Sequence, residues 1–318
     1  MQTALVAGGA GFIGSHLVKH LLTKDFNIIC VDNLITGSLK NIEDIKDNPK
    51  LFFLKQDISK GVEIPNIDRV DFVFHLASPA SPNKKSKNSY MSYPVETLLV
   101  NSYGTYNLLE FSRKYKSKFL FASTSEIYGD PLVSPQKEDY FGNVNPVGVR
   151  AVYDEAKRFG EAITMAYFRK YLLNTRIARI FNTFGPFMQP DDGRVVSNFV
   201  NQAIKNEPIT IYGTGEQTRS FCYIDDMVLG IGKAMFDRDT IGNVINLGNP
   251  DERSIKELAD VIKKLIGSSS SIVYEELPKD DPKTRCPDIS KAKKLLDWEP
   301  SVTLEGGLKK TIDYFKSI

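Results

Sequence analysis

The first half of the chain alternates short apolar runs with longer stretches in which apolar residues recur every three or four positions. The short runs predict buried β-strands at residues 4–7, 27–32, 51–54, 72–76, 119–123 and 176–180. The periodic stretches predict helices at residues 12–22, 95–115 and 153–171. Strands joined by crossover helices form a parallel sheet, so the expected fold class is α/β with a doubly wound Rossmann sheet of six strands.

Beyond residue 180 the sequence pattern changes, because glycine and proline break the chain into short elements. Helices are still predicted there at residues 197–205, 225–236, 255–266, 291–296 and 304–315. We therefore expect a Rossmann domain at residues 1–180 and a smaller second lobe made mainly of residues 181–318. Residues 220–250 are expected to return to the first domain.

Residues 81–93 are polar, lack any period and carry three lysines, Lys84, Lys85 and Lys87. Such a segment predicts an exposed loop, and two roles stay open for it: a mobile surface segment or part of a lid.

Composition places the chain among ordinary globular proteins, because 42% of its residues are hydrophobic and 25% are charged. The 41 Lys and Arg residues are balanced by 39 Asp and Glu residues, which leaves a net charge of +2. A nearly neutral chain offers no basic surface, so we expect neither nucleic acid nor a membrane as a partner. Individual basic residues must bind any anion.

The cysteines and the N-terminal residues bear on the location of the protein. Cys30, Cys222 and Cys286 are far apart and lack metal-ligand spacing, which indicates free thiols in a reducing compartment and no metal site. The first residues show no basic region, long apolar segment or cleavage site, and no later run reaches the ~20 apolar residues that span a membrane. We expect a cytoplasmic protein.

The first predicted strand runs directly into a Gly-Gly-Ala-Gly-Phe-Ile-Gly segment that opens the first helix. In such a turn Gly8 permits the tight bend, Gly11 lets the backbone approach a pyrophosphate, and Gly14 lets the helix pack on the sheet. The helix N-terminus, at Phe12 and Ile13, presents N–H groups and partial positive charge to the phosphates. From this run alone, a glycine-rich turn without a dinucleotide stays the alternative.

The end of the second predicted strand favours NAD over NADP. Asp32 can accept hydrogen bonds from both ribose hydroxyls of an adenosine and would repel a 2′-phosphate, and no arginine follows it closely. Further cofactor contacts are expected from the residues beside Asp32 and after the next two strands, namely Asn33, Thr36, Gly37, Asp57, Ile58, Leu76, Ala77 and Ser78. The alternative role of Asp57 is to cap a helix. The alternative role of the small residues Ala77 and Ser78 is to pack against their neighbours.

Tyr153 and Lys157 stand four residues apart in a predicted helix, so both side chains project from one face. A free tyrosine, with a pKa of about 10, is a poor base at neutral pH. An adjacent ammonium and the positive nicotinamide ring favour the phenolate, which makes Tyr153 a candidate base. The pair alone also occurs in helices by chance.

A second group of polar residues, Thr124, Ser125 and Glu126, follows the fifth predicted strand. Ligands bind at this edge of a doubly wound sheet, so these side chains can face Tyr153. Thr124 can share the proton of a substrate hydroxyl with Tyr153, and Glu126 can act as a base or position a charged group. The alternative for Glu126 is to cap the following turn.

Together these features resemble the extended short-chain dehydrogenases, and within them the UDP-glucuronate decarboxylases, also called UDP-xylose synthases. The resemblance rests on the glycine run, Asp32, the Thr124–Glu126 segment and the Tyr153/Lys157 pair. Further matching motifs run along the chain at residues 75–82, 122–130, 143–146, 153–158, 178–186, 192–199, 217–221 and 246–250.

The resemblance implies an NAD-dependent reaction on a UDP-sugar. Tyr153 takes the proton of the sugar C4 hydroxyl while hydride passes to NAD, which leaves a 4-ketone β to the C5 carboxylate. Such a β-keto acid loses CO₂ readily, because the resulting carbanion is delocalised into the ketone. Protonation at C5 and return of the hydride regenerate NAD.

Three other activities stay open on the sequence. The nucleoside-diphosphate-glucose 4,6-dehydratases carry Asp-Glu where this chain has Ser125-Glu126, and they need an acid to expel hydroxide. A UDP-glucuronate 4-epimerase would share the oxidation at C4 and differ in rotation of the ketone. A non-catalytic NAD-binding sensor is disfavoured, because Thr124, Tyr153 and Lys157 are all present.

The resemblance also assigns substrate contacts. Arg219 would face the diphosphate with Asn182 beside it, Tyr212 would lie near the uracil, and Arg285 near the sugar or diphosphate. The full predicted set of substrate contacts is Ser125, Glu126, Asn182, Thr183, Arg194, Val195, Tyr212, Arg219 and Arg285, and Asn101 and Ala122 join the cofactor contacts. For each arginine a surface salt bridge is the alternative. Relatives pair through the helices predicted at 95–115 and 153–171, which implies a homodimer.

The chain departs from the family pattern at a few positions. Ala156 replaces a glycine, Phe187 an arginine, and Leu99-Val100 a Lys-Thr pair, and the 81–93 loop is longer than usual. The missing lysine would meet the substrate and the missing arginine would lie near its pocket, so the identity of the sugar stays open.

Overall fold

The computed structural model describes residues 1–83, 86–277 and 281–318. Its centre is one parallel sheet in the order β11-β6-β5-β4-β1-β2-β3. The strands are β1 (Thr3–Ala7), β2 (Asn27–Asp32), β3 (Leu51–Lys55), β4 (Phe72–His75), β5 (Lys118–Thr124), β6 (Thr175–Ile180) and β11 (Val244–Leu247). Because all of them run in one direction, their carboxyl ends meet at a single edge.

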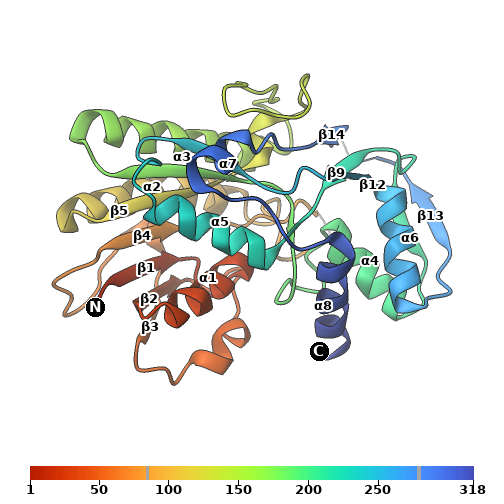
Figure 1. Cartoon of the computed structure of the whole chain (residues 1–318), viewed down its shortest axis with the longest axis horizontal. Helices are drawn as coiled ribbons and strands as arrows, with labels where there is room; N and C mark the ends of the chain where they lie inside the picture. The colour runs from red at the N-terminus through yellow and green to blue at the C-terminus, as the bar shows by residue number, and fades with distance from the viewer. Residues whose placement is uncertain (84–85, 278–280) are drawn as a thin grey trace.

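Helices cover both faces of this sheet (Figure 1). One face carries α1 (Phe12–Thr23) and α5 (Ile224–Phe236), which contact each other, and the other carries the pair α2 (Pro94–Tyr115) and α3 (Ala151–Tyr171). The remaining connections hold short 3₁₀ segments, η1 (Leu39–Ile45), η2 (Ile58–Lys60) and η3 (Ser125–Tyr128). The predicted α/β class with a Rossmann sheet is confirmed.

The second lobe is built from four helices and three small sheets. The helices are α4 (Val195–Ile204), α6 (Ile255–Ile266), α7 (Ser290–Leu296) and α8 (Leu304–Lys316). The small sheets pair β8 (Ile209–Tyr212) with β13 (Ile272–Glu275), β7 (Thr183–Phe184) with β10 (Cys222–Tyr223), and place β9 (Thr218–Ser220) between β12 (Glu252–Ser254) and β14 (Thr284–Arg285). One apolar cluster runs from strand β1 through α5 into this lobe.

The expected count of six strands was wrong, because β11 adds a seventh beside β6. This strand has only four residues, and Asn246 interrupts its short apolar run, so the sequence marks it weakly. Together with α5 it brings residues 224–247 into the sheet domain.

The exposed loop expected at residues 81–93 was also wrong for most of the described residues. Ser81, Ser86, Ser89 and Tyr90 are each at most 4% exposed, whereas Lys87 is exposed. The hydroxyls of Ser89 and Ser92 donate to the carbonyls of Ser81 and Ser86 within the loop, and the Ser81 hydroxyl donates to the carbonyl of Asp192, so a polar sequence can be buried here without losing hydrogen bonds. Lys84 and Lys85 lie outside the described residues.

The three cysteines are buried free thiols. Within the part of the chain that the structure describes, no helix has both the length and the apolar character needed to cross a bilayer.

Candidate active site

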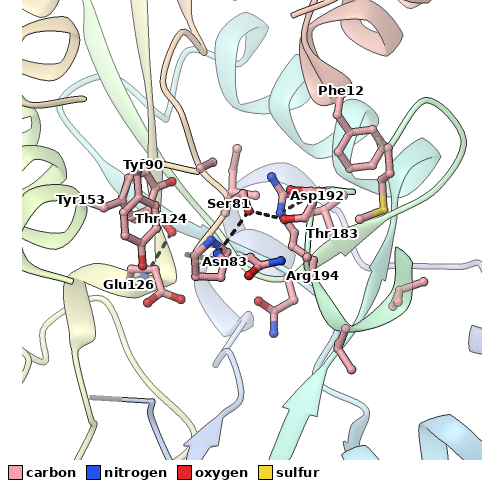
Figure 2. Close-up of a pocket in the computed structure, with 18 of the residues that line it drawn as sticks. Phe12, Ser81, Asn83, Tyr90, Thr124, Glu126, Tyr153, Thr183, Asp192 and Arg194 are labelled. Carbon is pink, nitrogen blue, oxygen red and sulfur yellow. Dashed lines mark hydrogen bonds and ion pairs between the residues drawn. The ribbon is translucent and has the colours of Figure 1, made fainter. Parts of the chain in front are cut away.

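A cleft of about 600 Å³ runs along the carboxyl edge of the sheet, where it meets the second lobe (Figure 2). Most of the predicted site residues line it, namely Gly8, Gly11, Phe12, Ile13, Gly14, Thr36, Leu76, Ser78, Ala122, Thr124, Ser125, Glu126, Tyr153, Lys157, Asn182, Thr183, Arg194, Val195, Tyr212 and Arg219. Others lie outside its described lining: Asp32, Asn33, Gly37, Asp57, Ile58, Ala77, Asn101 and Arg285. Loops from strands far apart in sequence therefore converge on one cavity.

The glycine turn between β1 and α1 forms one end of the cleft. Gly8 has a φ of +81°, and a Cβ there would lie 2.7 Å from the backbone of Ala77. A Cβ on Gly14 would lie 2.0 Å from the carbonyl oxygen of Gly8. No side chain of the described residues caps α1 at Gly11, so the first N–H groups of the helix are open to an anion.

Asp32 ends β2 beside this turn and is 7% exposed. Its carboxylate accepts hydrogen bonds from the N–H groups of Ala10 (3.0 Å) and Leu34 (2.8 Å), and burial raises its pKa. A Cβ on Gly37 would lie 2.7 Å from the same carboxylate, so glycine keeps that side of Asp32 free of a side chain. A carboxylate here fits a ribose diol and disfavours a 2′-phosphate.

Two further predicted cofactor residues have structural roles. Asp57 accepts a hydrogen bond from the N–H of Ser59 (3.0 Å) and caps η2, and Ile58 is 3% exposed in the core beneath α2. The capping alternative for Asp57 is therefore what the structure shows, and contact of this segment with adenine stays a prediction. Asn33 similarly accepts from the N–H of Ile35 (3.1 Å).

Asn101 has an unsatisfied acceptor next to the cleft. The side chain is fully buried, and its Nδ2 donates to Ser78 Oγ (2.9 Å) and to the carbonyl of Thr97. Its Oδ1 finds no hydrogen-bond partner among the described residues. A buried acceptor without a partner is costly, so Asn101 Oδ1 is a candidate acceptor for a hydroxyl group of a bound ligand.

Helix α3 places Tyr153 and Lys157 one turn apart, both at most 7% exposed. The hydroxyl of Tyr153 is hydrogen-bonded to Thr124, which ends β5. Lys157 Nζ donates to the carbonyl of Ala122 (2.8 Å) and lies 5.8 Å from the centroid of the Tyr153 ring. Helix α3 and the end of β5 thus bring together Thr124, Tyr153 and Lys157, which the sequence predicted to lie near one another.

Without a cofactor, the surroundings of Tyr153 in the folded chain do not favour its phenolate. Burial raises the pKa of Tyr153 to about 12, and the hydrogen bond from Thr124 and the charge of Arg194 offset this only in part. Burial also lowers the pKa of Lys157 to about 7, although Glu161 opposes that shift. A positive charge brought in by a bound cofactor is therefore needed to ionise the phenol near neutral pH.

Glu126 lies on the same wall between two arginines. Arg150 Nη2 and Arg285 Nη1 each donate to one of its carboxylate oxygens. Burial by itself would raise the pKa of Glu126, but the two guanidinium groups outweigh it and hold that pKa well below its usual range. Glu126 is therefore an anion. Its predicted alternative, capping the next turn, does not match these partners.

Arg285 does not reach the cleft as expected. It is 1% exposed behind Glu126, where it also donates to Ser125 Oγ (3.3 Å) and to the carbonyl of Gly129 (2.8 Å). Residues 284–285 pair with β9, which holds the arginine in this second layer. The guanidinium of Arg285 binds Glu126 in this structure, its Nε finds no partner among the described residues, and its contact with a substrate stays a prediction.

A second carboxylate, Asp281, links Arg150 to Arg219. Asp281 bridges Arg150 Nη1 (3.1 Å) and Arg219 Nη2 (2.9 Å), and all three residues line the cleft. Sequence reasoning missed Arg150, although it stands three residues before Tyr153, a spacing that puts both on one helical face. It missed Asp281 because no local pattern marks it.

The second lobe supplies the opposite wall of the cleft. Arg194 pairs with Asp192 (3.2 Å) and is partly exposed, and α4 begins at Val195 with no cap from a described side chain. Asn182 and Thr183 follow β6, and Tyr212 ends β8. Arginines and an open helix N-terminus together suit a diphosphate.

Tyr90, from the 81–93 loop, is the other residue that sequence reasoning missed. Its ring stacks on Tyr153 with centroids 5.0 Å apart and planes 6° apart, and it lines the cleft (Figure 2). The sequence did not reveal Tyr90, because a single aromatic residue in a polar, lysine-rich segment gives no periodic signal.

Comparison with known proteins agrees with this geometry. Residues 4–248 match the model of the NAD dependent epimerase/dehydratase family. The chain belongs to this family. The glycine turn, Asp32 and the unsatisfied Asn101 fit the family's cofactor, NAD.

Named relatives in this family extend over almost the whole chain. The chain is 47% identical over 312 residues to UDP-glucuronic acid decarboxylase 1 of Xenopus tropicalis, covering 98% of this chain and 72% of that protein. It is also 47% identical over 305 residues to UDP-glucuronic acid decarboxylase 3 of Arabidopsis thaliana, covering 96% and 86%.

Solved structures of the family share the fold. UDP-glucose 4-epimerase from Thermotoga maritima superposes with a TM-score of 0.89 at 32% identity, covering 99% of each chain. UDP-glucuronic acid 4-epimerase from Bacillus cereus, in complex with UDP-glucuronic acid and NAD, superposes with a TM-score of 0.86 at 30% identity and the same coverage.

The departures from the family pattern fall in different places. Leu99 is 37% exposed on α2 and Val100 is packed in the core, and neither is among the described residues that line the cleft. Phe187 does line the cleft, and Lys19 Nζ lies 3.9 Å from the centroid of its ring. Ala156 is buried in α3.

Proposed function

We propose that the protein converts UDP-glucuronate to UDP-xylose and CO₂, with bound NAD reduced and reoxidised within each cycle. Relatives named UDP-glucuronic acid decarboxylase match over 96–98% of the chain, which supports the substrate. The observation that carries the proposal is one cleft wall that holds Tyr153, hydrogen-bonded to Thr124, beside a Glu126 fixed as an anion.

The first step is oxidation at C4 of the sugar. The Tyr153 phenolate takes the proton of the C4 hydroxyl, and Thr124 holds that hydroxyl by a second hydrogen bond. NAD, when bound, accepts the C4 hydride and returns it after CO₂ has left. Lys157, held by the carbonyl of Ala122, adds positive charge beside the phenolate once it is protonated.

The second step breaks the C5–C6 bond. Its electron pair moves into the C4 ketone to form an enolate, and C6 leaves as CO₂. A proton taken up from water then adds at C5, and Tyr153 gives its proton back to the C4 oxygen as the hydride returns to C4, so the cycle consumes one proton and atoms and electrons balance. No acid is needed to expel CO₂, which suits a site whose nearest carboxyl group, Glu126, stays ionised. A 4,6-dehydratase would need an acid to expel hydroxide, and this chain has Ser125 where the dehydratases carry an aspartate.

The deciding experiment incubates the purified, NAD-loaded protein with UDP-glucuronate. We expect CO₂ and UDP-xylose in equal amounts without net NADH. UDP-galacturonate as the product would replace this proposal with a 4-epimerase. No turnover of any nucleotide sugar by protein that carries NAD would favour a sensor.

We further propose a homodimer that forms through α2 and α3. These helices lie together on one face of the sheet and expose Val95 (59%), Tyr103 (61%) and Phe159 (48%) (Figure 1). Tyr103→Glu should yield a monomer by light scattering, whereas Tyr274→Glu, on the exposed strand β13, should leave the dimer intact. A monomeric parent protein would contradict the proposal. A cytoplasmic location stays a proposal that the buried free thiols support.

A further inference from the structure

Tyr90 combines deep burial with an unused hydroxyl. The residue is 1% exposed, and its hydroxyl finds no hydrogen-bond partner among the described residues. Leaving such a group unsatisfied costs on the order of 1–3 kcal/mol, so a protein that buries one generally uses it for a ligand. The side chain lines the cleft, so a ligand there can reach it.

The hydroxyl lies in a charged neighbourhood. The groups that act on it electrostatically are Arg150, Glu126, Asp154 and Tyr153. The two oxygens of Glu126 each accept a hydrogen bond from an arginine, whereas Asp154 Oδ1 finds no partner among the described residues. The Tyr90 hydroxyl forms a hydrogen bond with neither carboxyl group, so its donor is unused.

The surrounding charges favour an incoming anion. Three arginines, Arg150, Arg219 and Arg285, form ion pairs with two carboxylates, Glu126 and Asp281. A third carboxyl group, Asp154, interacts with Arg150 and Arg285, and burial together with Glu126 raises its pKa to about 8, so the network keeps an excess of positive charge while Asp154 is protonated. Both Nη atoms of Arg150 bind carboxylates, but a guanidinium has five N–H donors, so some remain for a ligand.

We propose that the hydroxyl of Tyr90 and the guanidinium of Arg150 form the subsite that binds the C5 carboxylate group of a hexuronic acid substrate. This inference rests on the proposed function and deepens it. The carboxylate supplies the acceptor that Tyr90 lacks and the negative charge that the arginine network lacks. A neutral hexose, which carries a hydroxymethyl group at this position, supplies no charge.

The stacked ring has a second, positioning role. Because the ring of Tyr90 covers one face of Tyr153 at 5.0 Å, the base and the carboxylate subsite are held in one fixed relation. The same residue thus fixes where the carboxylate sits relative to the C4 hydroxyl. Loss of CO₂ requires that relation, since the breaking C5–C6 bond must overlap with the C4 ketone.

Two substitutions separate these roles. Tyr90→Phe removes the hydroxyl and keeps the stacked ring, and Tyr90→Leu removes both. Binding is measured by calorimetry on NAD-loaded protein in a Tyr153→Phe background, where turnover is blocked. The ligands are UDP-glucuronate, UDP-glucose and UDP. Tyr274→Phe is the matched control, because Tyr274 is an exposed residue of β13 that is not among the described residues lining the cleft.

We expect Tyr90→Phe to weaken UDP-glucuronate binding about tenfold or more while UDP-glucose and UDP change by less than about twofold. With an intact Tyr153, Tyr90→Leu should lower kcat further than Tyr90→Phe does. Equal losses for UDP-glucuronate and UDP-glucose, or no loss for either, would overturn the carboxylate subsite.

Failure of this inference can be told apart from failure of the proposed function. If the parent protein releases CO₂ from UDP-glucuronate and Tyr90→Phe leaves the preference for the uronate unchanged, only the subsite is wrong. If the parent protein releases no CO₂ but loses its preference for the uronate in Tyr90→Phe, the subsite stands and the decarboxylase assignment falls.

Discussion

Tyr153 is a base that the folded chain alone keeps protonated. Burial raises its pKa to about 12, because the phenolate loses its hydration in the closed wall of the cleft. Thr124 and Arg194 act in the opposite direction but do not outweigh burial. The positive ring of the cofactor must therefore contribute to ionisation, which ties the proton transfer to occupancy of the dinucleotide site.

Replacement of Tyr153 tests this role. We expect Tyr153→Phe to reduce turnover of UDP-glucuronate by roughly 10²–10⁴-fold, because the proton acceptor is removed while the ring and its stacking partner remain. NAD affinity, measured by fluorescence titration, should be nearly unchanged. Turnover near that of the parent protein would remove Tyr153 as the base. Tyr274→Phe is the control for handling and folding.

Glu126 makes folding stability depend on pH in acid. Burial opposes its charge, but Arg150 and Arg285 lower its pKa to about 2 in the folded protein, against about 4.5 in the unfolded chain. Because the folded pKa is the lower one, the stabilisation is present above pH 4.5 and is lost as pH falls towards 2.

The corresponding measurement is chemical denaturation at pH 5 and pH 3. The parent protein should lose roughly 2 kcal/mol more of its free energy of unfolding between these pH values than Glu126→Gln does, since glutamine does not titrate. Identical pH slopes for the two proteins would show that the arginines do not hold Glu126 as an anion.

The site residues that could be predicted are those marked by a local sequence pattern, either their spacing in a helix or their position at the end of a strand. Tyr153 and Lys157 lie one turn apart on a helix, and Thr124 ends a strongly apolar strand, so period and position alone bring them to one edge. Tyr90 and Asp281 join them only through loops that meet in three dimensions. No spacing along the chain encodes those contacts.

At the scale of elements, the turn between β1 and α1 depends on the absence of a side chain. A Cβ at Gly14 would lie 2.0 Å from the carbonyl oxygen of Gly8, so the helix could not keep its present place against the strand. The same close approach aims the first N–H groups of α1 at the cleft.

We therefore expect Gly14→Ala to weaken NAD binding at least about tenfold and to lower the melting temperature, because helix and turn must shift apart. Gly232→Ala is the matched control, since Gly232 lies within helix α5 and its added Cβ would meet only a ring atom of Phe236 at 3.9 Å. That variant should be as stable as the parent protein or slightly more so. Equal NAD binding in both variants would contradict the role of the turn.

Most elements follow from sequence pattern, and the exceptions have physical causes. The six strands and the helices predicted from apolar periodicity all form, with shifts of one or two residues at their ends. Strand β11 escapes detection because its four residues gain stability from pairing with β6, a contact with a distant part of the chain. The 81–93 loop is buried because its hydroxyls bond within the loop.

At the scale of the whole molecule, the two lobes are joined by shared packing. One apolar cluster contains Val6 of β1, Met227 of α5 and Ile262 of α6. Helix α5 contacts α1 on the sheet side and α7 on the other. The cleft lies where these units meet, so a ligand that binds in it stabilises both together.

Trp298, the single tryptophan, offers a probe of this coupling. It is 5% exposed in the second lobe, and its indole N–H donates to the carbonyl of Asp226 on α5 (3.0 Å). Thermal unfolding followed by Trp298 fluorescence should therefore coincide with unfolding followed by far-ultraviolet circular dichroism. NAD at about 100 times its Kd adds roughly 2.7 kcal/mol and should raise both midpoints equally. A fluorescence transition that separates from the dichroism transition, or that NAD leaves unmoved, would mean that the second lobe unfolds independently of the sheet.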